Sequence, residues 1–332
     1  MKRIVFNFVI VAMILVFTVS SCEKDIPVTS VRLLHQIALT LVVGDEESLI
    51  DDMVVYPENA KMSLKWKTDN PSVAIVANGV VTALSVGSAT IIITSKNGKQ
   101  MCICPVTVID STPKQMYITA KQSNSETAIY MGGTGTATID WGDGTDVETH
   151  ELNQRIGRKY SHFYSDESPF YTITIIGANV RYFALDYNQP ITNLDVSNNP
   201  ALTRFGFANN QLTNLDVSNN PILAYLDCVG NQLTSLDLSN NLKLLELWCS
   251  RNQLTSLDLS NNSMLTFLDC SSNQLSSSAL NNLFSTLHSN SIIHSSRENR
   301  KIISVENNPG TYECDASIAT KKGWTVYKIK EE

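Results

Sequence analysis

Apolar and polar positions repeat with a fixed step between Val180 and Asn273. In its best form the repeated phrase reads L-x-x-L-x-C-x-x-N-Q-L-T-x-L-D-L-S-x-N, and copies follow one another at 21 residues, with one irregular step near Pro190. An Asn-Gln pair marks every copy, at Asn188, Asn210, Asn231, Asn252 and Asn273. A period of about 20–29 residues with Leu and Asn at set offsets predicts a solenoid.

Each unit contains two apolar half-phrases, of which the first is exemplified by Leu223, Leu226 and Cys228. The alternation within its L-x-C part is that of a β-strand, with the outer residues pointing inward and the middle residue outward. We expect the Asn that closes each half-phrase to turn the chain and to satisfy buried backbone groups of the next coil. Over residues 180–275 the pattern resembles the leucine-rich repeat family, and similar phrases recur in Bacteroidetes surface proteins.

The outward positions of the two half-phrases behave differently. In the second they barely change, and Asp recurs at Asp195, Asp216, Asp237 and Asp258. In the first they differ freely. A position that is the same in every copy favours a structural role, and a position that differs between copies favours recognition. Exposed Tyr, Trp and Arg also tend to dominate interfaces. We therefore predict a ligand-binding face formed by Tyr182, Arg204, Tyr225, Asp227, Glu246, Trp248, Arg251, Phe267 and Asp269.

Two alternatives stay open for these columns. The variation of the outward residues in the first half-phrase is also compatible with unselected sequence drift on a solvent-exposed face. The repeated Asp residues form either a hydrogen-bonded scaffold along the stack, which we favour, or an acidic stripe for cations. Equal spacing of Cys228, Cys249 and Cys270 predicts a column of free thiols that pack as small apolar groups, without a metal site.

The repeat becomes irregular after Asn273, and we expect a C-terminal cap from about residue 276. Helical spacing covers Ser278–His288, a strand is expected at Lys301–Val305, and a short helix at Asp315–Lys322 precedes a last strand that starts at Trp324. Terminal units of a solenoid are atypical because they close an open core. Trp324 is therefore expected to be buried.

The segment 27–110 is typical of a small β-sandwich. Short apolar or alternating runs are separated by turn residues, and Asn78-Gly79 between two such runs predicts a tight hairpin, since both positions tolerate positive φ. The stretches Trp66–Ala74, Gly79–Ala83 and Gly87–Ile91 resemble the bacterial Ig-like group 2 domain. That resemblance implies a spacer or adhesive module with Trp66 in its core.

The segment 112–179 is predicted to form a second β module. Thr138–Thr145, Tyr160–Tyr164 and Tyr171–Ile175 resemble the Ig-like fold of polycystic-kidney-disease (PKD) type domains. Asp143 is expected to cap backbone donors in the Gly142–Gly144 turn. A calcium loop is the alternative, although the Asp-x-Asp-x-Asp-Gly rhythm is missing. The fold class is thus mainly β and multidomain, with two sandwiches, then a leucine-rich repeat solenoid over 180–332 with an α/β cap.

The N-terminus indicates where the protein resides. Lys2 and Arg3 precede an apolar run of about 16 residues, which suits an export signal better than a spanning helix. Cys22 follows Val19-Ser20-Ser21, which resembles the lipobox of bacterial lipoproteins, so residues 1–21 are predicted to be a signal peptide and 22–26 a lipid-anchored linker. Glu23-Lys24-Asp25 resembles the surface-export signal of Bacteroidetes lipoproteins. We expect outer-membrane attachment through acyl chains alone and exposure at the cell surface.

Charge and motifs limit the function. Loss of residues 1–21 removes two basic residues and no acid, so 25 basic residues become 23 against 32 acidic ones and the net charge is −9. A nucleic-acid binder needs a basic face, so nucleic acid is not an expected partner. We find no catalytic motif and expect no enzyme, no cofactor and no metal. The predicted function is that of a monomeric surface lipoprotein in which a stalk presents a solenoid that binds a protein or a glycan. The alternative is a glycan-capture accessory of a polysaccharide-uptake system.

Overall fold

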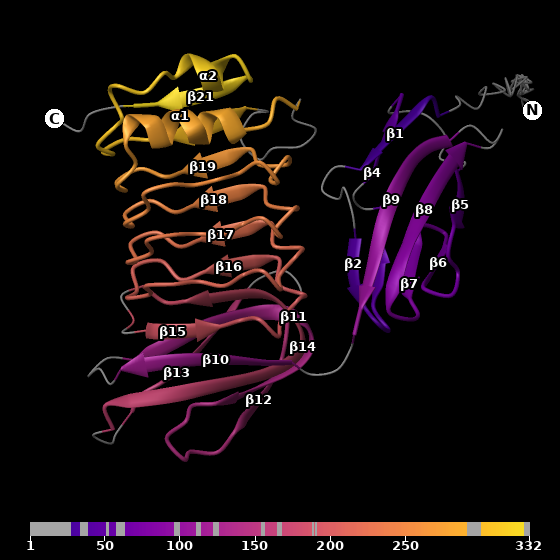
Figure 1. Cartoon of the computed structure of the whole chain (residues 1–332). Helices are drawn as coiled ribbons and strands as arrows, with labels where there is room; N and C mark the ends of the chain where they lie inside the picture. Colours follow the sequence, from indigo (N-terminus) through magenta and orange to yellow (C-terminus); the bar gives the residue numbers. More distant parts are fainter. Residues whose placement is uncertain are drawn as a thin grey trace, which may run out of the picture.

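The computed structural model describes residues 28–33, 39–50, 53–57, 64–95, 100–110, 114–121, 126–153, 157–164, 168–187, 189, 191–290 and 300–328. Within them the chain forms a small N-terminal β module that lies beside a long stack of coils (Figure 1). The predicted signal peptide, Cys22 and the linker lie outside these residues, as do Asn188 and Pro190. No helix in the described part is long and apolar enough to cross a membrane.

Over its described residues, the N-terminal module forms three small sheets. One sheet has the order β2-β9-β8-β5, the second has the order β3-β7-β6, and β1 pairs with β4. The strands are β1 Ser30–Leu33, β2 Leu39–Val42, β3 Glu46–Ser48, β4 Met53–Tyr56, β5 Leu64–Thr68, β6 Ala74–Ala77, β7 Val80–Ala83, β8 Gly87–Ser95 and β9 Gln100–Ile109. Strands from the sheets share one apolar core that includes Leu41, Val81 and Ile93.

The predicted hairpin at Asn78-Gly79 is confirmed. Ala77 of β6 is paired with Val80 of β7, so the loop contains two residues, and Asn78 and Gly79 have φ values of 50° and 83°. Both values are positive, as the tight turn that matches the twist of the flanking strands requires. Trp66 packs, partly buried, against the module's core.

The C-terminal strands form one continuous sheet, which is 12-stranded over the residues that the structure describes. Its path runs β12-β11-β14-β16-β17-β18-β19-β20-β21, while β13 pairs with β11 and β10 pairs with both β14 and β15. The strands are β10 Lys114–Lys121, β11 Thr127–Asp140, β12 Glu148–Glu151, β13 Arg158–His162, β14 Phe170–Leu185, β15 Ile191–Asp195, β16 Arg204–Gly206, β17 Tyr225–Asp227, β18 Glu246–Trp248, β19 Phe267–Asp269, β20 Lys301–Ser304 and β21 Trp324–Tyr327.

Strand β14 joins the second β module to the solenoid. It is antiparallel to β11 and β10, while its end, Tyr182–Ala184, pairs in parallel with β16. The strand therefore crosses residue 179, at which the sequence places a module boundary. A single apolar core extends from Met116 through Trp141 and Leu247 to Trp324. The second module thus covers the N-terminal end of the solenoid core.

Buried Asn side chains connect successive coils, as the sequence predicts. The Nδ2 of Asn231 donates to the carbonyl oxygens of Phe207, one coil back at 3.0 Å, and of Cys228 at 3.2 Å. Asn252 and Asn273 repeat this arrangement with carbonyl oxygens that lie 24 residues earlier in the chain. The half-phrases therefore turn at positions where the Asn amide replaces water as the partner of buried backbone groups.

The cysteine column lies inside the stack. Cys228, Cys249 and Cys270 directly follow strands that are paired in register, and all three are 0% exposed. They are free thiols, as the equal spacing predicts. Burial raises their pKa values well above the ordinary value of a thiol. Such thiols pack as small apolar side chains.

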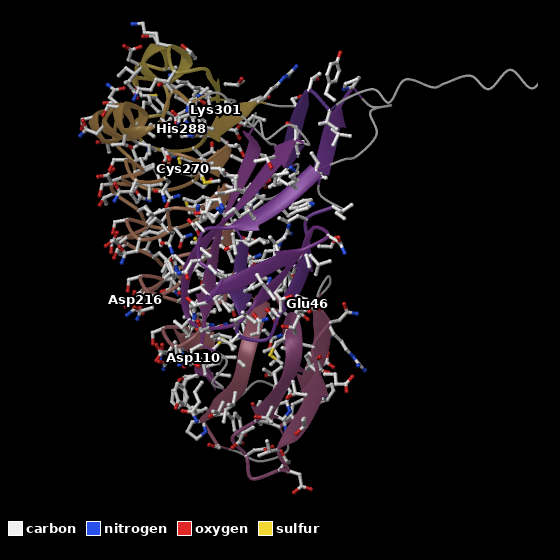
Figure 2. All side chains as sticks on the ribbon, turned by 90° about the vertical axis from the view of Figure 1, so that its right-hand side faces the viewer. Glu46, Asp110, Asp216, Cys270, His288 and Lys301 are labelled. Atoms are coloured by element: carbon white, nitrogen blue, oxygen red, sulfur yellow. The ribbon has the colours of Figure 1, made fainter. Side chains whose placement is uncertain are left out.

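The C-terminal cap extends the parallel sheet before it ends. Helix α1, Ser277–Thr286, begins at the N-cap Ser276, whose side chain accepts from the Ala279 backbone N–H. Strands β20 and β21 then continue the ladder, and the short helix α2, Ser317–Thr320, lies between them in sequence. Figure 2 places His288 and Lys301 together at this end of the stack, close to Cys270. The expected burial of Trp324 is confirmed at 2% exposure.

Candidate ligand-binding face

The parallel strands align the variable positions of the first half-phrase into two rows. We call the surface that these rows cover the outer sheet face. The first row reads Tyr182, Arg204, Tyr225, Glu246, Phe267 and Ile302, and the second reads Ala184, Gly206, Asp227, Trp248, Asp269 and Ser304. The residues between the rows, such as Phe205 and Leu226, are buried in the core.

The outer sheet face is hollowed at its N-terminal end. The floor is formed by Ala184 and Gly206, adjacent residues of the second row with little or no side chain. Tyr130 of β11 is paired with Ala184, so it stands at one end of the floor, and Asp227 stands at the other. The volume of this hollow is about 280 Å³. Strands lie about 4.8 Å apart, so the distance across the sheet from Tyr130 to Asp227 is about 14 Å.

Side chains of the first row and of the adjoining segments make the walls. Tyr182, Arg204 and Tyr225 line one side of the hollow, and Asp186 and Tyr187, just after β14, line the other. The Arg204 guanidinium carbon lies 4.0 Å from the centre of the Tyr225 ring, which is a cation–π contact. Cross-strand contacts of this kind hold the side chains of an otherwise open face in place.

An aromatic pair extends the face beyond the hollow. The rings of Trp248 and Phe267 have centroids 5.2 Å apart and planes tilted by 45°. Both side chains are only partly buried. Trp248 also lines the hollow, so the aromatic surface continues from it toward β19.

Both acidic and basic side chains line the hollow. Burial raises the pKa of the Asp227 carboxyl, the hydrogen bond from the Val229 N–H lowers it, and the neighbouring Asp269 charge raises it. The Val229 bond, 3.2 Å long, is made to Oδ1. Among the residues that the structure describes, no hydrogen bond reaches Oδ2 of Asp227. Burial also raises the pKa of the Tyr182 phenol.

Most residues predicted for the binding face lie in the two rows, but two of them differ from the expectation. Glu246 is in the first row and is only 6% exposed, so its carboxylate is largely covered. Arg251 lies outside the sheet, in the turn after β18, with a left-handed φ of 55°. The same left-handed turn position is occupied by Asn209 and Gly230 in the two preceding coils. Arg251 is therefore an exposed turn residue beside the rows.

The hollow also includes residues that the repeat comparison misses. Tyr130 and Tyr187 line it; Tyr130 lies outside the repeat, and Tyr187 has the repeat position that Arg251 has in a later coil. Tyr187 is 62% exposed and follows β14 at the irregular step of the repeat. A partial signal exists for Tyr187, because it precedes an Asn-Gln pair in the same way as Arg251, which the sequence predicts for the face. No local pattern places Tyr130 beside Ala184, because their pairing joins distant parts of the chain.

The repeated Asp residues act locally. In each copy an Asp Oδ1 accepts from the backbone N–H two residues later, as in Asp216 with Ser218 at 2.9 Å. The same bond recurs at Asp195, Asp237 and Asp258. Hydrogen bonds from the hydroxyl and backbone N–H of Ser218 lower the pKa of Asp216, and those from the backbone N–H and hydroxyl of Ser239 lower the pKa of Asp237. The scaffold is thus a turn cap within each coil, where the sequence suggested bonding along the stack. Figure 2 shows Asp216 at the margin of the solenoid.

Asp143 also serves a turn, as predicted. Its Oδ1 accepts from the backbone N–H and hydroxyl of Thr145, and its Oδ2 lies 2.7 Å from His162 Nε2. Burial raises the pKa of Asp143, but the bonds from Thr145 and His162 outweigh it and hold the pKa at about 2. Gly142 in the same turn has φ 79°, and a Cβ there would collide with the Thr172 carbonyl. Within the described residues, no three His, Cys, Asp or Glu side chains gather as a metal site requires.

Comparison with known proteins gives partial matches. Residues 60–108, within the N-terminal module, match the family described as the N-terminal β-sheet domain of hyaluronate lyase. An uncharacterized protein of Clostridium acetobutylicum is 32% identical over 97 residues, which are 28% of this chain and 24% of that protein. The functional domain of InlJ from Listeria monocytogenes, described as including a cysteine ladder, is 34% identical with a TM-score of 0.31. That match covers 43% of this chain and 33% of the other. The chain thus spans a third or less of these relatives.

Proposed function

We propose that this chain is a non-enzymatic recognition protein whose outer sheet face binds a protein or a glycan. The observation that carries the proposal is the alignment of dissimilar aromatic and charged side chains in two rows on one continuous sheet. Structural demands are alike in every coil, and the Asn, Leu and Cys positions meet them in the same way. The variation is concentrated on the outer sheet face, which is where recognition would require it.

The remaining modules are proposed to carry this face away from a membrane. Cys22 is the proposed lipid attachment site, which would anchor the protein to the outer membrane with its modules at the cell surface. We assign residues 27–110 to a bacterial Ig-like group 2 domain, supported by the small sheets around one apolar core and by the Asn78-Gly79 hairpin. We assign 112–179 to a PKD-like module, supported by the turn around Asp143 and by the stacking of Trp141 on His162. The protein would act as a monomer.

Lipid attachment is tested separately from recognition. Cells that express the chain are grown with an alkyne analogue of palmitate, and the protein is then examined for the label. We expect labelling of the natural chain and none of Cys22→Ala. Equal labelling of both would place the lipid elsewhere and remove the basis for the proposed anchor.

Recognition is tested by binding to the immobilised full-length protein. Purified extracellular matrix proteins and polysaccharides are applied to the natural chain and to Tyr225→Ala and Trp248→Ala, which remove one aromatic side chain from each row. Tyr327→Ala is the matched control, since Tyr327 is 39% exposed and lies on β21, one strand beyond the last residue of the second row. We expect the first two variants, but not the control, to lose binding. Binding that survives both would refute the proposed face.

A second candidate function is glycan capture for a polysaccharide-uptake system. It is favoured by the number of aromatic rings around the hollow, because such rings stack on the apolar faces of sugars. The binding test separates it from protein adhesion by the class of molecule retained.

A further inference from the structure

We propose that the hollow between the second β module and the first coils is a binding site for a neutral carbohydrate. This inference rests on the proposed function and assigns a ligand class and a location within the outer sheet face. Its members come from both modules, because β14 brings Tyr130 of β11 beside the first residues of the solenoid rows.

The shape of the hollow suits a sugar. Its floor of Ala184 and Gly206 is low, with Phe205 buried beneath it, while the aromatic side chains that line it above the core are those of Tyr130, Tyr182, Tyr187, Tyr225 and Trp248. Rings around a low floor present flat apolar surfaces, on which the C–H groups of a pyranose can stack. The volume of about 280 Å³ is close to the lower limit of small-molecule sites.

The polar groups match hydroxyl recognition. Oδ2 of Asp227 receives no hydrogen bond from the described residues and belongs to a half-buried carboxylate at the end of the floor. A carboxylate oxygen in this position accepts from a hydroxyl donor, and charge strengthens such a bond. The Arg204 guanidinium and the Tyr hydroxyls provide donors for sugar oxygens.

The charge balance favours a neutral sugar over an acidic one. Asp186 and Asp227 line the hollow, Asp186 is paired with Lys159 at 3.7 Å, and the Arg204 guanidinium covers the face of Tyr225. A uronate or a sulfated sugar would bring negative charge close to the half-buried Asp227 carboxylate, which is unfavourable where water is partly excluded. A neutral glycan avoids this repulsion and keeps the stacking surface.

Gly206 allows a direct test, because its substitution can fill the hollow without disturbing the fold. A Cβ added at Gly206 would lie 3.6 Å from the Ala184 Cβ and 3.9 Å from the Asp227 Cβ, which are ordinary contacts. Gly206→Leu would therefore cover the floor. Ser304→Leu is the matched control, since it adds the same side chain to the same row on β20. Asp227→Asn removes the carboxylate charge with little change of shape.

The experiment is isothermal titration of the full-length protein in detergent with neutral hexasaccharides of cellulose, xylan, mannan, starch and chitin, and with hyaluronan and polygalacturonate oligosaccharides as acidic probes. We expect saturable binding of at least one neutral probe, weakened about tenfold or more by Gly206→Leu and by Asp227→Asn. Ser304→Leu should change the affinity by less than about twofold. Circular dichroism checks that each variant is folded.

Three results would overturn the inference: no neutral probe binds, an acidic probe binds more tightly, or Gly206→Leu and Ser304→Leu have equal effects. The proposed function is decided separately, by the Tyr225→Ala and Trp248→Ala variants. If a protein partner binds and is lost in Tyr225→Ala and Trp248→Ala while every sugar fails, recognition by the outer sheet face stands and the carbohydrate site falls. If a sugar binds but Gly206→Leu leaves it unchanged, the site lies elsewhere.

Discussion

The two columns of buried Asn provide a test of how the solenoid is held together. Asn231 and Asn241 belong to the same coil, are 6% and 0% exposed, and both donate through Nδ2 to backbone carbonyl oxygens. They differ as acceptors. Oδ1 of Asn231 accepts from the Leu212 N–H one coil back at 3.1 Å, whereas Oδ1 of Asn241 accepts from none of the described residues.

This difference predicts unequal costs when each is replaced by Ala. In Asn231→Ala the buried Leu212 N–H loses the bond from its Asn partner, and an unsatisfied buried group costs about 1–3 kcal/mol. The carbonyl oxygens that Asn231 contacts keep other donors, since Asn210 and Asn252 also donate to those of Phe207 and Cys228. Adding roughly 1 kcal/mol for the lost donated bonds, we expect the free energy of unfolding to fall by about 3 kcal/mol.

Asn241→Ala should cost less. Its two acceptors, the carbonyl oxygens of Val217 and Asn220, each retain a backbone N–H donor. No N–H is orphaned, and a buried oxygen without a partner is removed. We therefore expect a loss of about 1 kcal/mol. The difference between the two substitutions is then about 2 kcal/mol, although their chemistry and burial are alike.

Urea unfolding of the full chain measures these costs. Trp141 and Trp324 lie in the C-terminal core and report on its transition, whereas Trp66 packs against the separate N-terminal core. With a slope of about 3 kcal/mol/M, a loss of 2 kcal/mol moves the midpoint by about 0.7 M urea. The control is Gln232→Ala, an exposed position next to Asn231, which should change stability by no more than about 0.5 kcal/mol.

Two outcomes would refute this reasoning. If Asn231→Ala and Asn241→Ala have equal midpoints, the accepting bond to Leu212 contributes nothing measurable. If Asn231→Ala behaves like the Gln232→Ala control, the Asn columns do not hold adjacent coils together at all.

Further predictions concern titration, thiols and backbone strain. Because burial raises the Cys249 pKa, this thiol should not react with a disulfide reagent in the native protein and should react once urea unfolds it; fast native labelling would contradict the burial. The Asp143 pKa lies at about 2, below its ordinary value of 3.8, so its stabilising effect is complete above pH 3.8 and is lost as pH falls toward 2. Asp143→Asn should make the melting temperature depend less on pH between pH 3.8 and about 2. Burial lowers the pKa of His288, so below about pH 6.5 the unfolded chain gains a proton that the folded chain does not, and stability should fall; a His288→Gln variant without a shallower pH profile would contradict this. Arg251→Gly should raise the free energy of unfolding by up to about 1 kcal/mol in urea, because Gly adopts the left-handed φ without strain; a loss of stability would show that the arginine side chain contributes more than its backbone costs.

The repeated part of the fold is determined by the sequence alone. When Leu226, Cys228 and Asn231 recur at one interval, equal backbone turns must place each type above its own kind, so the apolar interior, the thiol column and the Asn columns follow from the spacing. The two rows of the outer sheet face follow for the same reason. The tight turn at Asn78-Gly79 is likewise predictable, because its conformation depends on two adjacent residues.

Only the tertiary structure decides what lies next to the first coil. Tyr130 reaches the hollow through the antiparallel pairing of β11 with β14, which joins residues far apart in the chain and has no local signature. Burial of Glu246 and the displacement of Arg251 into a left-handed turn depend on neighbouring coils and on backbone geometry that a residue column does not contain. Periodicity specifies how a unit meets a copy of itself, whereas a contact between unlike modules depends on their shapes once folded.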